Sequence, residues 1–169
     1  MSGQQPPSTT TSGSSVSLVV ILAFDFGTRR IGVASGNTMS RMAQALCTLE
    51  CRQQQIPWSD IDRLLRDYLP GQLIVGLPYN DDGTPTGMTP AAQAFAAALA
   101  ERSKLPVALV DERHSSKEAE RELAYLRRSG VKTRRVTHAD VDMTAAKVVL
   151  ERWFSDSSAA NQTMDNQAT

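Results

Sequence analysis

Residues 18–26, with the sequence LVVILAFDF, form the most apolar stretch of the chain and decide its fold. Only Asp25 interrupts this run, which is otherwise rich in β-branched and aromatic residues. Such a pattern is typical of a central strand that is buried on both faces of a sheet. Gly27 permits a tight turn after it, so residues 31–34 are predicted to pair with this strand as a hairpin.

The rest of the chain alternates between strand and helix patterns. We predict strands at 43–49, 73–77 and 105–110, and helices from 59 or 60 to 68, from the Thr89–Pro90 cap onward, at 115–130 and at 138–154. Three hairpin-linked strands followed by strand–helix alternation indicate an α/β fold. We expect a mixed five-stranded sheet flanked by helices.

Length and composition favour one intracellular domain. The chain has 169 residues, 41% of them hydrophobic, and residues 1–17 and 155–169 are polar enough to be predicted as disordered tails around a domain at 18–154. Equal numbers of basic and acidic residues, 18 each, argue against coating nucleic acid by bulk charge. Two cysteines, no signal peptide pattern and no apolar run of about 20 residues indicate a cytoplasmic protein without a membrane span.

Carboxylates stand at two positions where burial alone does not explain them. Asp25 lies in the buried strand, where an isolated carboxylate is costly; the alternative is that it caps the Gly27 turn. Asp111 and Glu112 directly follow the strand at 105–110, and ligands of open α/β sheets bind beyond the carboxyl ends of strands. The alternative for this second pair is two solvated loop acids.

Asp142 is the third candidate, on the last predicted helix. It stands at the head of an apolar stripe formed by Ala145, Ala146, Val149 and Trp153, so its side chain is expected to point toward the sheet. The helix dipole favours negative charge there, and the alternative is an acid that caps its own helix.

If Asp25, Glu112 and Asp142 converge, their oxygen ligands favour Mg²⁺ or Mn²⁺ over zinc. Two such ions about 4 Å apart can activate a water and stabilise the leaving oxygen of a phosphodiester. Asp111 is one candidate to orient that water.

A basic segment offers a path for a phosphate backbone. Residues 102–135 carry ten Lys or Arg against five Asp or Glu. The predicted nucleic-acid-binding set is Arg29, Arg30, Arg113, Lys117, Arg127, Arg128, Lys132, Arg134 and Arg135. The alternative is an ordinary solvated helix face. Aromatic residues are only 5%, so backbone contacts are expected rather than base stacking.

Five motifs in order give the chain a family resemblance: residues 23–33 (AFDFGTRRIGV), 74–83 (IVGLPYNDDG), 111–113 (DER), 115–119 (SSKEA) and 141–146 (VDMTAA). They resemble the YqgF family, the group named for pre-16S rRNA nuclease and Holliday junction resolvase. The resemblance implies a ribonuclease H-like fold and a metal-dependent nuclease that matures the 5′ end of small-subunit ribosomal RNA. It places the family's acidic residues on Asp25, Glu112 and Asp142. Met143 and His114 depart from the usual pattern, where a serine and an apolar residue are common.

The leading hypothesis is therefore hydrolysis of an RNA phosphodiester with Mg²⁺ or Mn²⁺, with ribosomal precursor RNA or structured DNA as partner. We expect a monomer or a weak homodimer. Three other functions stay open: a resolvase of four-way DNA junctions, which usually acts as a symmetric dimer, a non-catalytic ribosome-assembly factor, and a nucleotide-binding protein that uses the turn at residues 25–28.

Overall fold

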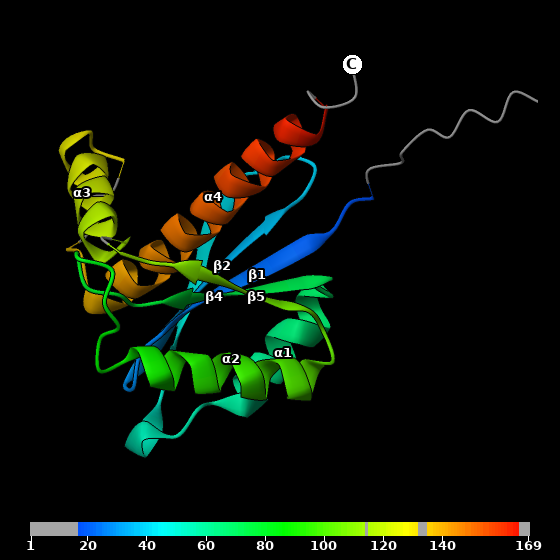
Figure 1. The fold of residues 1–169 in the computed structure, drawn as a ribbon. Helices are drawn as coiled ribbons and strands as arrows, with labels where there is room; N and C mark the ends of the chain where they lie inside the picture. The colour runs from blue at the N-terminus through cyan, green and yellow to red at the C-terminus, as the bar shows by residue number, and fades with distance from the viewer. Residues whose placement is uncertain (1–16, 114, 132–134, 166–169) are drawn as a thin grey trace, which may run out of the picture.

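The computed structural model describes residues 17–113, 115–131 and 135–165 (Figure 1). Along the described chain lie β1 (Val20–Phe26), β2 (Arg30–Asn37), β3 (Ala43–Glu50), a 3₁₀ turn (Arg52–Gln54), α1 (Trp58–Tyr68), β4 (Gln72–Leu77), α2 (Thr89–Ser103), β5 (Val107–Asp111), α3 (Ser115–Arg128) and α4 (His138–Asp165). The predicted order of strands and helices is confirmed.

The five strands form one mixed sheet in the order β3-β2-β1-β4-β5. β2 runs antiparallel to both β1 and β3, whereas β4 is parallel to β1 and to β5. The carboxyl ends of β1, β4 and β5 therefore meet at one edge of the sheet. Asp25 and Glu112 both belong to this edge, with β4 between their strands.

Helices cover both faces of the sheet (Figure 1). Leu22 and Phe24 of β1 pack in a cluster with residues of α1 and α2, while Ile21 and Ala23 pack in a second cluster with α4. Asp25 shares the face of Ile21 and Ala23, because successive side chains in a strand alternate. Its carboxylate therefore lies on the α4 side of the sheet.

The α1–α2 side is fixed by aromatic packing around Phe95 of α2. Its ring lies 4.8 Å from that of Phe26 and 5.9 Å from those of Phe24 and Trp58. Such pairs contribute about 0.5–1.5 kcal/mol each beyond the area they bury. This packing holds β1, and with it Asp25, against a rigid layer.

Several predicted boundaries are wrong. β2 extends to Asn37 rather than ending at residue 34. α1 begins at Trp58, before residues 59 and 60 where the sequence predicts its start, and α2 begins at Thr89. Neither helix has a side-chain cap, so the predicted cap at Thr89 does not form.

The last helix does not end at residue 154 but continues to Asp165, so residues 155–165 are helical rather than a disordered tail. This segment contains no glycine or proline that would stop a helix. The predicted disorder of residues 1–16 and 166–169 lies outside the described residues. Among the helices described, none combines the length and apolar character that a membrane crossing requires.

Candidate active site

Glu112 reaches Asp25 by crossing the intervening strand. Glu112 directly follows β5, and its backbone N–H donates to the carbonyl of Leu77 at the end of β4 (3.0 Å). Its carboxyl lies over Gly76 of β4, where a Cβ atom would overlap Oε2 of Glu112 and approach its Cδ to 3.0 Å. The missing side chain at Gly76 thus makes the room through which the carboxyl passes.

The carboxyl groups of Asp25 and Glu112 share a hydrogen bond away from bulk water. Glu112 is only 8% exposed. Burial, the charge of Asp25 and the hydrogen bond to it raise the pKa of Glu112 to about 9, which outweighs the opposite effect of Arg152. Burial also raises the pKa of Asp25 to about 6, which the hydrogen bond from Glu112 opposes. At neutral pH the two carboxyl groups therefore hold one proton between them.

Asp142 lies in the second turn of α4, close enough for its charge to raise the pKa of Asp25 further. Gly32 of β2 pairs with Asp25, and a Cβ atom at Gly32 would overlap the backbone carbonyl of Asp142. The start of α4 therefore lies directly against β2. The Asp142 carboxylate accepts a hydrogen bond from Nε of Arg30 at 2.5 Å.

The structure brings the carboxyl groups of Asp25 and Glu112 together, whereas the nearby Asp142 pairs with Arg30. Within the described ranges, no group of three or more His, Cys, Asp or Glu side chains is arranged to hold a metal ion. The physical reason is that Arg30 neutralises Asp142, while Asp25 and Glu112 share a proton. Glu112 is buried, so the alternative of a solvated loop acid is wrong for this residue. Asp25 is hydrogen-bonded to Glu112.

The Asp25–Glu112 pair nevertheless fits a hard divalent cation. Both residues offer oxygen ligands, which Mg²⁺ prefers in proteins. Oε2 of Glu112 is buried and has no hydrogen-bond partner among the described residues. A buried acceptor without a partner is costly, and a cation would satisfy it.

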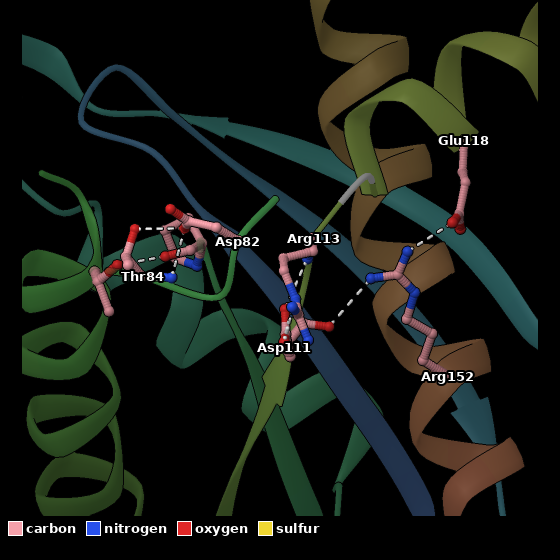
Figure 2. A network of polar contacts seen from close by, with 8 residues as sticks. Asp82, Thr84, Asp111, Arg113, Glu118 and Arg152 are labelled. Atoms are coloured by element: carbon pink, nitrogen blue, oxygen red, sulfur yellow. Dashed lines mark hydrogen bonds and ion pairs between the residues drawn. The ribbon is translucent and has the colours of Figure 1, made fainter. Parts of the chain in front are cut away.

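Asp111, expected as a candidate to orient water, faces a different partner. Its carboxylate accepts hydrogen bonds from the backbone N–H of Arg113 (2.9 Å) and from Nε of Arg113 (2.7 Å) (Figure 2). Its backbone carbonyl accepts from Arg152 of α4 (3.1 Å), which also donates to Glu118 of α3 (2.7 Å). Sequence reasoning missed Arg152, since a charged residue late in a helix is normally solvated.

The polar loop after β4 lies beside Arg113 at the same edge (Figure 2). Asp82 accepts hydrogen bonds from the N–H (2.9 Å) and the hydroxyl (2.6 Å) of Thr84, which lower its pKa. Gly83 has a φ of +85°, and a Cβ atom there would lie 3.4 Å from Nη1 of Arg113. The loop is therefore an ordered turn at the rim of the site.

The predicted basic residues fall into two groups. Arg30 and Arg113 are engaged with Asp142 and Asp111, next to the carboxylate pair. Arg127 and Arg128 are exposed at the end of α3 and line a cavity of about 580 Å³ together with Val136.

An adjacent cavity, which shares Glu120 and Val136, is lined by Arg135 and His138 at the start of α4. Arg29 is exposed in the turn after β1. Lys132 and Arg134 lie outside the described residues, as does the side chain of Lys117.

Two solved structures share this architecture. Thermus thermophilus RuvC in complex with a Holliday junction substrate has a TM-score of 0.51 at 13% identity, covering 82% of this chain and 96% of that one. The fowlpox virus resolvase, solved with Holliday junction DNA, has a TM-score of 0.53 at 11% identity, covering 81% and 97%. These likenesses identify the fold as ribonuclease H-like.

The fold defines the class as ribonuclease H-like, and the family and the relatives that match the chain make it a nuclease. The chain belongs to the RuvX family, described as Holliday junction resolvase, whose model matches residues 19–156. A Xylella fastidiosa (strain M23) protein named "Putative pre-16S rRNA nuclease" is 43% identical over 137 residues, 81% of this chain and 88% of the relative. A Burkholderia vietnamiensis protein of the same name is 42% identical over 145 residues, 86% of this chain and 95% of the relative. The resemblance stated from the motifs is confirmed.

Proposed function

We propose that this protein is a cytoplasmic, divalent-metal-dependent nuclease that hydrolyses RNA phosphodiester bonds in the precursor of 16S ribosomal RNA. The observation that carries the proposal is the buried contact between Asp25 and Glu112, in which Oε2 of Glu112 has no hydrogen-bond partner in the part of the chain that the structure describes. The name shared by the bacterial relatives supports the choice of RNA as substrate.

In this proposal Asp25 and Glu112 hold Mg²⁺ or Mn²⁺, and Asp142 is the third ligand. A bound ion supplies Lewis-acid activation of a water molecule and neutralises charge on the phosphate. Glu112 must lose its proton to act as a metal ligand, because a protonated carboxyl group lacks the negative charge that binds the cation. Burial of Glu112 over β4 keeps bulk water away from its carboxyl group, which strengthens the charge interactions there.

The basic residues position the nucleic acid in this account. Arg113 lies at the rim of the site. Further basic side chains line the two adjacent cavities between the end of α3 and the start of α4: Arg127, Arg128 and Arg135. The exposed Arg29 is proposed to bind phosphates as well. Lys117, Lys132 and Arg134 stay predictions from the sequence. Contacts to phosphates alone would make binding salt-dependent and insensitive to base sequence.

The test is cleavage of precursor ribosomal RNA by the full chain with Mg²⁺ or Mn²⁺, with chelator as the negative control. Asp25→Asn and Asp142→Asn are expected to abolish cleavage. Asp67→Asn, an exposed acid on α1 across the sheet, is the matched control and is expected to cleave normally. Cleavage that persists in the two site variants, or in chelator, contradicts the proposed mechanism.

The description of the matched family favours one second candidate, cleavage of four-way DNA junctions. The same carboxylates would serve both reactions, because each breaks a phosphodiester. Offering a DNA four-way junction beside the RNA in one assay separates the two. Cleavage of the junction alone would replace RNA as the substrate, and cleavage of neither by the unmodified chain rejects both.

A further inference from the structure

The ion pair between Arg30 and Asp142 occupies the place where a third ligand would be needed. Nε of Arg30 lies 2.5 Å from Oδ2 of Asp142, and the two side chains are 36% and 25% exposed. Arg30 is the first residue of β2, and Asp142 lies 112 positions further along the chain. The contact therefore joins the sheet edge to the start of α4.

The start of α4 also has contacts that do not involve this ion pair. The hydroxyl of Thr48 in β3 donates to the carbonyl of Ala139 (2.7 Å), and Thr137 donates to Asp140 from its N–H (2.8 Å) and its hydroxyl (2.7 Å). Ala145 and Ala146 are fully buried against the sheet side. The helix start thus has packing and hydrogen bonds independent of Arg30.

A divalent ion and Arg30 compete for the same carboxylate. A guanidinium group has only hydrogen-bond donors and is not deprotonated in proteins. It therefore cannot release the Asp142 carboxylate by losing a proton. The helix start cannot move closer to β2, because the carbonyl of Asp142 already lies against Gly32, and the hydrogen bond from Thr48 to Ala139 holds it to β3. Arg30 is partly exposed, so it can turn away without burying its charge.

We propose that Arg30 is an internal counter-cation: it occupies the Asp142 carboxylate in the metal-free protein, and an incoming divalent ion must displace it. This inference rests on the metal site of the proposed function. It makes Arg30 a positioning residue that acts through Asp142 and sets the ion concentration at which the site fills. A structural pin would behave in the opposite way, since its loss would loosen the site and weaken metal binding.

The test is Mn²⁺ binding to the full chain without nucleic acid, measured by calorimetry and by the paramagnetic resonance signal of free Mn²⁺. Arg30→Gln is expected to bind Mn²⁺ about fivefold more tightly than the unmodified chain, the upper range for a partly exposed pair. Arg29→Gln makes the same charge change at the neighbouring exposed position and is expected to leave the Kd within about twofold.

The Asp142→Asn background shows whether Arg30 acts through Asp142. There, adding Arg30→Gln is expected to leave Mn²⁺ affinity unchanged. Unchanged or weaker binding by Arg30→Gln alone, an equal gain with Arg29→Gln, or a gain that persists beside Asp142→Asn overturns the inference. In each of those cases Mn²⁺ still binds, so the proposed function stands. Failure of the unmodified chain and of Arg30→Gln to bind Mn²⁺ overturns both.

Discussion

Replacing Gly76 with alanine adds one methyl group at the point where Glu112 crosses β4. That methyl would overlap Oε2 of Glu112, approach its Cδ to 3.0 Å and lie 3.2 Å from Cγ2 of Val149. The Glu112 carboxyl is the end of a flexible side chain and can swing away. Val149 is fully buried against the sheet and has less freedom.

The expected cost in stability is therefore small, whereas the cost in function is large. Overpacking a core costs about 1–3 kcal/mol, and we expect about 1 kcal/mol because the main clash is with a movable group. Moving Glu112 separates it from Asp25 and removes one ligand of the proposed ion. Loss of supporting groups alone costs metal sites about 10–100-fold, so we expect a loss of at least about 100-fold in Mn²⁺ affinity and in cleavage rate.

Urea denaturation gives the stability term, and Mn²⁺ titration with an RNA cleavage assay gives the functional term. Gly87→Ala is the matched control, because nothing lies within 4 Å of the added atom; it is expected to match the unmodified chain in all three measurements. Gly76→Ala that retains Mn²⁺ affinity and cleavage within about threefold would refute the passage of Glu112 over β4.

Three further outcomes follow from the same geometry. Gly32→Ala places a methyl against the backbone of Asp142, not against a movable side chain, so it is expected to destabilise by about 3 kcal/mol or more in urea denaturation; a loss under 1 kcal/mol would contradict the close approach of α4. Because Glu112 has a folded-state pKa raised from 4.5 to about 9, the metal-free folded protein keeps a proton that the unfolded chain has lost, so stability should fall as pH rises between those values. Glu112→Gln should flatten that slope in urea titrations at several pH values; an unchanged slope would show that the proton is not on Glu112. Asp142→Asn is expected to change stability by less than about 1 kcal/mol in thermal unfolding, because its pair with Arg30 is partly exposed, while cleavage is lost; a larger fall would make the pair a structural one.

The central strand and the position of Asp25 could be predicted because they depend on local sequence. A nearly continuous apolar run specifies a strand buried on both faces, and Asp25 is its single polar interruption. The apolar stripe on the last helix also predicts correctly which side of the helix faces the sheet. Three of its residues are fully buried: Ala145, Ala146 and Val149.

The contact between Glu112 and Asp25 could be expected, because both follow strands whose carboxyl ends meet at one edge. The passage of the Glu112 carboxyl over Gly76 of β4 could not be predicted. The route depends on the register that pairs Gly76 with Val110, which parallel strands far apart in sequence do not reveal. A glycine inside an apolar strand is a recognised sign of close approach, so Gly76 was the available signal.

The pairing of Arg30 with Asp142 could not be predicted from the sequence. Arg29 and Arg30 are adjacent, and only the three-dimensional structure shows which of them reaches Asp142. Arg30 turns to α4 while Arg29 stays exposed. The continuation of α4 to Asp165 does not follow from composition: the segment is polar, which predicts disorder, but it contains no glycine or proline to stop the helix.

The most direct measurement is a crystal of the full chain soaked in Mn²⁺ and analysed by anomalous scattering. We expect an anomalous peak bonded to carboxylate oxygens of both Asp25 and Glu112, over Gly76, with Arg30 no longer hydrogen-bonded to Asp142. A fully occupied peak elsewhere, or a site that touches Asp25 while Glu112 points away, would contradict it.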